Sequence, residues 1–105
     1  SGTAFDLPIA IGLLAANEQI AKYEALKDYV IMGELSLDGK LRPIKGALPI
    51  AIQTRKEGFK GLIIPAVNAR EAGMVNNLKV YGVETMKEVI DFFENDIKQI
   101  IKNII

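Results

Sequence analysis

GLIIPAVNAREAGMVNNLKVYGV, residues 61–83, determines the fold class of this 105-residue chain. Its first seven residues form a continuous apolar run, which is typical of a strand that is buried on both faces. Residues 68–75 predict a short helix capped by Asn68, and residues 78–83 predict a second strand. A strand, a helix and a strand in this order form a β-α-β unit with parallel strands, so we expect an α/β fold.

Upstream of this unit, the sequence predicts a β-hairpin followed by a helix. Residues 29–37 are rich in strand-forming side chains, Asp38 and Gly39 are a strong turn signal, and residues 40–44 return as the second strand. Residues 46–57 then have apolar side chains at helical spacing, and Gly58 supplies a stop signal. We therefore expect a β-hairpin plus a β-α-β unit with packed helices.

A helix is also expected near the start of the chain. Residues 7–16 are almost all apolar, with Thr3 or Asp6 as the cap, and a helix that is apolar on all sides must be covered on all sides. Two interpretations are open: residues 1–3 are a catalytic loop that leads into the helix, or the chain is part of a larger domain. Residues 17–29 form a polar connector with room for one helical turn.

A last helix is expected to run to the end of the chain. Thr85 and Glu88 form the capping-box pattern that marks a helix start. Apolar residues then recur at helical spacing, which predicts an amphipathic helix. These apolar positions are Val89, Phe93, Ile97, Ile100, Ile101 and Ile104.

The composition limits the chemistry that this chain can perform. It contains no Cys and no His, which excludes thiol catalysis, zinc–thiolate sites, histidine metal sites and Ser-His mechanisms. Carboxylates, Lys, Tyr or a Ser-Lys pair are left for catalysis. Lys plus Arg and Asp plus Glu number 13 each, so no net charge attracts nucleic acid. The apolar run at residues 7–16 is too short to span a bilayer, and we expect neither a metal site nor a membrane partner.

One basic stripe is a candidate nucleic-acid-binding surface. Lys40, Arg42 and Lys45 alternate along the second strand of the predicted hairpin, and residues 55–60 hold a second basic cluster. Domains that bind nucleic acid usually carry an excess of basic residues, which this chain lacks. A solvated face is therefore the simpler interpretation of the stripe.

The hairpin also contains a sequence that imitates a phosphate-binding loop. GELSLDGKL, residues 33–41, has five rather than four residues between its glycines and Leu41 where Ser or Thr would bind magnesium. It leads into a strand, which offers no helix N-terminus to a phosphate, so we interpret it as a plain turn. Glu34 and Asp38 belong to the same hairpin, whose tip faces water, and we do not expect them to act as an acid–base pair.

Three hydroxyl side chains are candidate nucleophiles by residue type. Ser1, Thr3 and Ser36 are ordinary loop and strand residues unless a lysine lies beside them, because a hydroxyl needs a base to activate it.

Four segments of the chain resemble one known family, in order and with matching spacing. They are GTAFDLPIAIGLLAA (2–16), MGELSLDGKLRPIKGALPIAI (32–52), IIPAVNAREA (63–72) and VYGVETMKEVIDF (80–92). Together they resemble the amino-terminal domain of the magnesium-chelatase-like AAA+ ATPases, the bacterial group that includes the competence-associated ComM proteins. More distantly, they resemble the proteolytic domain of Lon proteases and the carboxy-terminal domain of the RadA recombination ATPase.

This resemblance implies a Lon-protease-domain-like fold, which is shared with a domain of a small-subunit ribosomal protein and with the GHMP kinases. In that family a β-rich half precedes the first helix. Residues 1–105 are thus expected to be a single domain fragment, the carboxy-terminal part of a Lon-protease-like domain. The resemblance places ATP and Mg²⁺ in an ATPase module that this chain lacks, and no cofactor in the chain itself.

The resemblance to Lon also implies where a protease site would lie. Matched residue by residue, Ala4 takes the place of the nucleophilic Ser, Ile50 that of the activating Lys, and Met32 that of the Thr that helps to hold the Lys. A shift by one residue would nominate Thr3, but no lysine replaces Ile50. A Ser-Lys mechanism needs both nucleophile and base, so the site is expected to be degenerate and the chain to have no peptidase activity.

These observations predict a non-catalytic interaction and assembly domain of a cytoplasmic, magnesium-chelatase-like ATPase with a role in DNA processing. The alternatives are a module that contacts nucleic acid through Lys40, Arg42 and Lys45 and, with less support, a Ser-Lys peptidase. The expected partners are further copies of the chain, the ATPase module of the parent protein, and DNA. Self-association is expected to use an interface of roughly 1,000 Å² or more. Insertion of a metal into a porphyrin is not expected, because there is no His or Cys ligand.

Overall fold

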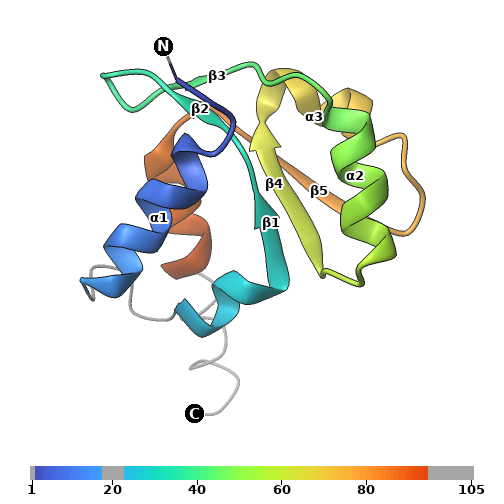
Figure 1. Cartoon of the computed structure of the whole chain (residues 1–105), viewed down its shortest axis with the longest axis horizontal. Coiled ribbons are helices and arrows are strands. Elements are labelled where there is room, and N and C mark those ends of the chain that lie inside the picture. Colours follow the sequence, from blue (N-terminus) through green and yellow to red (C-terminus); the bar gives the residue numbers. More distant parts are fainter. Residues whose placement is uncertain (1, 18–22, 95–105) are drawn as a thin grey trace.

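A parallel three-stranded sheet in the order β1-β4-β5 forms the centre of the molecule (Figure 1). The computed structural model describes residues 2–17 and 23–94. A separate antiparallel pair, β2 and β3, lies beside the sheet, and residues 86–94 form a last helix. The elements are α1 (Asp6–Ala16), the 3₁₀ helix η1 (Tyr23–Asp28), β1 (Tyr29–Ile31), β2 (Glu34–Leu35), β3 (Leu41–Arg42), α2 (Ala47–Lys56), β4 (Gly61–Pro65), α3 (Ala66–Ala72) and β5 (Lys79–Val83).

The predicted β-α-β unit is confirmed. β4 and β5 pair in parallel from Gly61 opposite Lys79 to Pro65 opposite Val83, and α3 connects them. All five residues of β4 are buried, as its apolar run predicts for the central strand of a sheet covered on both faces. Helix α3 lies so close to β5 that a Cβ atom on Gly82 would come within 2.8 Å of the Cβ of Ala69.

The prediction of one strand over residues 29–37 is wrong. Residues 29–31 form β1, which pairs in parallel with β4, and only Glu34 and Leu35 pair with the returning strand. The break lies at Gly33, whose N–H donates to the carbonyl of Ala4 (2.8 Å) and whose carbonyl accepts from the N–H of Leu7 (2.9 Å). Because Ala4 and the first turn of α1 take these backbone groups, the chain leaves the sheet and starts a second pairing.

The predicted turn between β2 and β3 is confirmed. Gly39 has a φ of 84°, a left-handed conformation that favours glycine. The N–H of Ser36 donates to the carbonyl of Lys40 (2.9 Å), which closes the turn around residues 37–39. The imitation of a phosphate loop at residues 33–41 is therefore a hairpin, as expected.

Helices cover both faces of the sheet and enclose two apolar cores (Figure 1). On one face, α1 and the helix at residues 86–94 bury Leu7, Ile11, Val89 and Phe93 against the strands. Aromatic rings join this helix to β1, since Tyr29 meets Phe93 edge to face at 5.5 Å between ring centroids. On the other face, α2 and α3 pack on β4.

Two of the predicted helix caps are wrong. The residue that precedes α1 is Phe5, and neither Thr3 nor Asp6 caps the helix with its side chain. The Asp6 carboxylate instead accepts from the N–H groups of Thr3 (3.2 Å) and Leu35 (3.1 Å), which ties α1 to β2. Asn68 lies inside α3, which begins at Ala66, and its side chain bonds elsewhere.

The other helix boundaries follow the predictions. Helix α2 lies between Gly46 and Gly58, both with positive φ, close to the expected bounds. At the last helix, the N–H of Glu88 donates to Thr85 Oγ1 (3.2 Å), as a capping box requires. The Glu88 carboxylate accepts from the N–H of Glu84 (2.7 Å) instead of that of Thr85. The predicted apolar positions Ile97, Ile100, Ile101 and Ile104 lie outside the described residues.

Across residues 2–17 and 23–94, no helix combines the length and the apolar character needed to cross a membrane.

Candidate functional site

The three positions of the expected degenerate protease site pack against one core. The side chains of Ala4, Met32 and Ile50 all contact the buried cluster between α2, α3 and the sheet. The backbone N–H of Gly33, the residue after Met32, donates a hydrogen bond to the carbonyl of Ala4. Residues from three separate segments are thus brought to one region of the fold.

Met32 and Ile50 also line a shared cavity of about 210 Å³ between β1 and α2. Val30 and Phe59 add further apolar wall. Among the lining residues, Thr54 carries the hydroxyl group and Glu57 the titratable group. The Thr54 hydroxyl donates to the carbonyl of Ile50 at 2.7 Å, a bond along its own helix. The wall of this cavity is mainly apolar, with Gln53, Thr54 and Glu57 as its polar residues.

Two of the three candidate hydroxyls lie within the described residues, and both make local hydrogen bonds. Thr3 Oγ1 accepts from the N–H of Phe5 (3.2 Å) at the start of α1. Ser36 Oγ lies 2.6 Å from an Asp38 carboxylate oxygen, within the hairpin turn. Ser1 lies outside the described residues.

The basic stripe does not follow one strand as predicted. Strand β3 contains only Leu41 and Arg42, while Lys40 forms an isolated bridge with Thr85 and Lys45 lies beyond the strand. The side chains of Lys40, Arg42 and Lys45 are all exposed. These three accessible cations, called the basic row below, lie within residues 40–45, and Arg42 is directly opposite Glu34 in the hairpin.

The side chains of the second basic cluster, Arg55, Lys56 and Lys60, lie near different parts of the chain. Arg55 Nη1 lies 3.5 Å from the carbonyl of Asn76, whereas the Lys60 ammonium lies 5.7 Å from the centroid of the Tyr29 ring. Lys56 is exposed at the end of α2. These three cations face different parts of the surface and do not form a single stripe.

Hydrogen bonds within the hairpin turn perturb the carboxylate of Asp38. The hydrogen bond from Ser36 lowers the pKa of Asp38 below the ordinary aspartate value, and the bond from the Lys40 N–H (3.1 Å) lowers it further. Asp38 therefore stays ionised at neutral pH and acts as a turn residue that holds the hairpin. No group of three or more Asp, Glu, His or Cys residues that could bind a metal occurs within the described ranges.

The sequence does not single out two further polar residues, Asn68 and Glu84, as candidate site residues. Asn68 is buried and bonds to the backbone of Ile44, and Glu84 lines a cavity at the end of β5. The position of Glu84 directly after an expected strand was a usable signal, since ligands of parallel sheets bind at the carboxyl ends of strands. No local pattern distinguishes Asn68 from an ordinary helix cap.

Comparison with known proteins gives one family match and several relatives. The family described as "Subunit ChlI of Mg-chelatase" matches residues 1–68. Competence protein ComM of Haemophilus influenzae is 39% identical over 97 residues, which is 92% of this chain and 19% of ComM.

Two other relatives are more distant. A mitochondrial Lon protease homolog of Zea mays is 34% identical over 76 residues, covering 67% of this chain and 8% of that protein. DNA repair protein RadA of Escherichia coli is 26% identical over 93 residues, covering 89% of this chain and 19% of RadA. The chain spans less than a fifth of the length of each of these relatives.

Proposed function

Since this chain belongs to the family of the ChlI subunit of Mg-chelatase, we propose that it is a non-catalytic interaction and assembly domain of an ATPase of that family. Its relatives are named as a competence protein and a DNA repair protein, so we assign the parent protein to DNA processing in the cytoplasm. ATP and Mg²⁺ would bind in a separate ATPase module. Residues 1–105 would form the carboxy-terminal part of a Lon-protease-like domain, the fold shared with a ribosomal protein domain and the GHMP kinases.

The outer face of α1 is the observation that carries this proposal. Phe5, Ile9 and Leu13 are 58%, 61% and 61% exposed and follow one another at four-residue intervals. At 100° per residue they lie opposite the buried Leu7 and Ile11. Single exposed apolar residues are common, but a row of three large ones on one helix face marks an interaction surface.

The outer edge of the sheet lies near this helix and adds a second surface. Strand β1 pairs only with β4 among the strands that the structure describes, so it is an edge strand. Beside it lies the apolar cavity of Val30, Met32, Ile50 and Phe59. An edge strand next to an apolar groove can accept a further strand from another chain or another part of the same chain.

We assign these two surfaces to assembly within the parent protein. A preceding β-rich half of the domain would cover the β1 edge and part of α1. In the isolated 105-residue chain both surfaces would be free to pair with a second copy, over an interface of roughly 1,000 Å² or more.

The absence of polar groups at Ala4, Met32 and Ile50 supports the non-catalytic part of the proposal. A Ser-Lys peptidase needs a hydroxyl and an amine in contact, and the three matched positions supply neither. We expect no cleavage of unfolded protein substrates and no labelling by serine-directed probes. Peptide cleavage that Thr3→Ala abolishes would contradict this part of the proposal.

Contact with nucleic acid is the second candidate function. It rests on the accessible basic row of Lys40, Arg42 and Lys45 and on the relatives named for competence and DNA repair. The zero net charge limits such contact to a weak, local interaction.

Sedimentation velocity over a hundredfold concentration range tests the assembly proposal. The wild-type chain should show a mass that rises with concentration. The double variant Ile9→Glu/Leu13→Glu should weaken association by about tenfold or more, because each charge replaces apolar area that the interface would bury. Met74→Glu is the matched control, since Met74 is 73% exposed outside α1.

Two outcomes decide the proposal. A wild-type chain that stays monomeric throughout and binds no hydrophobic dye would contradict it. Association that is unchanged in the double variant would move the interface from α1 to the β1 edge.

A further inference from the structure

The dipeptide Asp38–Gly39 in the β2–β3 turn is the one Asp-Gly sequence of the chain, which contains no Asn-Gly. Aspartate isomerises most readily before glycine, because glycine has no side chain to hinder attack of its backbone nitrogen on the preceding carboxyl group. Asp38 is exposed, so water reaches it. Each of the other aspartates is followed by a large side chain, namely Leu7, Tyr29, Phe92 or Ile97.

Isomerisation at this dipeptide would proceed through a cyclic succinimide. The Gly39 nitrogen bonds to Asp38 Cγ, and the proton of the nitrogen leaves with the hydroxyl of the carboxyl group as water. Water then adds to the ring and breaks one of its two C–N bonds. Breakage at Cγ restores aspartate, whereas breakage at the backbone carbonyl carbon of Asp38 leaves isoaspartate, whose main chain passes through Cβ and Cγ. No atom is gained or lost overall, and the main chain becomes one atom longer.

The folded turn engages both reacting groups in other hydrogen bonds. The Gly39 N–H donates to the carbonyl of Ser36 at 3.0 Å. The Asp38 carboxylate lies 2.6 Å from Ser36 Oγ and accepts from the Lys40 N–H at 3.1 Å. Because the bond from Ser36 lowers the pKa of Asp38, the carboxyl group rarely holds the proton that its hydroxyl needs in order to leave as water. Ring closure therefore requires these bonds to break.

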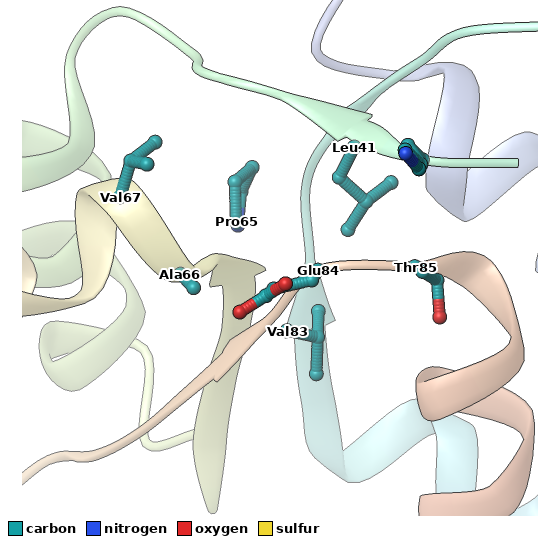
Figure 2. Close-up of a pocket in the computed structure, with 8 residues that line it drawn as sticks. Leu41, Pro65, Ala66, Val67, Val83, Glu84 and Thr85 are labelled. Carbon is teal, nitrogen blue, oxygen red and sulfur yellow. The ribbon is translucent and has the colours of Figure 1, made fainter.

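Contacts outside the turn keep it closed. The N–H of Met86 donates to the carbonyl of Gly39 at 3.0 Å, and the N–H of Leu41 donates to the carbonyl of Glu84 at 2.9 Å. Figure 2 shows β3, with Leu41, lying across the end of β5 beside Glu84. Gly39 is thus held through both its N–H and its carbonyl, so its nitrogen can approach the carboxyl group only after the turn leaves β5.

We propose that Asp38 is a site of isoaspartate formation, at which the modification is slow while the β2–β3 turn is closed and fast once the turn opens. The proposed assembly role does not use this site. The longer main chain of isoaspartate would displace the bond from the Ser36 N–H to the Lys40 carbonyl, which closes the turn. A modified chain would therefore lose the fixed hairpin that carries Lys40 and Arg42 of the basic row.

Ageing of the 105-residue chain in its folded and unfolded states tests this inference. The chain is kept at neutral pH in buffer and in guanidinium chloride, and samples are cleaved after lysine over time. Isoaspartate gives a second chromatographic peak of unchanged mass for residues 28–40, and electron-transfer fragmentation locates it. Asp28 lies in the same peptide before Tyr29 and is the internal control. Isoaspartate at Asp38 should form about tenfold or more faster in the unfolded chain, because the folded turn must first open.

Three variants test the hydrogen bonds of the turn. Ser36→Ala should raise the rate in the folded chain about threefold or more, as expected for the loss of one hydrogen bond, and should leave the rate in the unfolded chain unchanged. Ser36→Thr keeps the hydroxyl group and should keep the slow rate. Leu37→Ala is the matched control, since Leu37 lies fully exposed in the same turn and its side chain offers no hydrogen bond.

Three outcomes would overturn the proposal. The first is an equal rate at Asp38 in the folded and the unfolded chain. The second is a folded-state rate that Ser36→Ala leaves unchanged, and the third is more isoaspartate at Asp28 than at Asp38 in the unfolded chain.

Discussion

Asn68 and Ile44 hold each other through two hydrogen bonds of 3.0 Å. The Asn68 amide donates to the carbonyl of Ile44, and the Ile44 N–H donates to the Asn68 side-chain oxygen. Both residues are buried. The Asn68 side chain, on α3, thereby satisfies the hydrogen-bonding groups of the backbone just after β3, in the way that a neighbouring strand would.

Replacing Asn68 should be among the most destabilising changes in the chain. Asn68→Leu would leave the buried N–H and carbonyl of Ile44 without partners, at an expected cost of about 3 kcal/mol in the free energy of unfolding. Urea denaturation measures this cost. Asn76→Leu is the control, since Asn76 is exposed, and should change stability by less than about 0.5 kcal/mol. A loss below about 1 kcal/mol in Asn68→Leu would show that water replaces the amide.

Two glycines should respond to alanine with opposite signs. Gly82→Ala would place a Cβ 2.8 Å from that of Ala69, and the overpacking should cost about 1–3 kcal/mol. Gly12 lies in α1, and apart from its chain neighbours and the backbone of its own helix no atom lies within 4 Å of where its Cβ would be, so Gly12→Ala should stabilise the helix by up to about 1 kcal/mol. Thermal unfolding of both variants checks the signs. A neutral Gly82→Ala would mean that α3 can move away from β5.

The turn at Asp38 should lose stability on acidification. Its pKa is lower in the folded chain than in the unfolded one, so the folded state is favoured while Asp38 is ionised. This contribution is complete above the ordinary aspartate pKa and is lost as the pH falls through the lowered value. Ser36→Ala removes the main cause and should raise the pKa of Asp38 toward the ordinary value, as carboxyl ¹³C shifts would show. Lys40→Met keeps the backbone N–H bond to Asp38 and removes only the nearby positive charge, a smaller cause of the lowered pKa, so it should raise the pKa less.

Any binding of DNA should be weak, and its affinity should fall with rising salt concentration as expected for only a few contacts to phosphate groups. With three cations in the row, the logarithm of the affinity should fall with that of the salt concentration with a slope of about −3. Changing Lys40, Arg42 and Lys45 together to Ala should abolish binding. Changing Arg55, Lys56 and Lys60 together to Ala removes equal charge and should reduce it little, as fluorescence anisotropy with a labelled duplex would measure. The opposite result would assign the contact to the second cluster.

The parts of the fold that depend on local sequence could be predicted, and the parts that depend on distant contacts could not. The apolar run of β4 and the turn at Asp38 and Gly39 carry their own signals. The strand signal from residue 29 to 37 is continuous, and its break at Gly33 depends on hydrogen bonds to Ala4 and Leu7. Those partners lie more than twenty residues upstream, so no pattern around Gly33 reveals them.

The candidate sites show the same division. The sequence indicates that Ala4, Met32 and Ile50 are apolar, and it shows that the helix at residues 7–16 has apolar residues on all sides, although the structure leaves its outer row exposed. Whether Lys40, Arg42 and Lys45 share one strand depends on where β3 begins and ends. Strand propensity predicted residues 40–44, whereas β3 contains only Leu41 and Arg42. The pairing of Asn68 with Ile44 needs the packing of α3 beside the hairpin, which is a tertiary contact.

The order of the strands also governs the order in which the chain can fold during synthesis. β1 ends at Ile31, but its partner β4 begins only at Gly61, after the hairpin and α2 have been made. While the chain is still emerging from the ribosome, the apolar residues of α1 and β1 have no sheet to pack against. Nascent chains that end before β4 would therefore bind chaperones. The release of α1 and β1 from a chaperone should coincide with the emergence of residues 61–65.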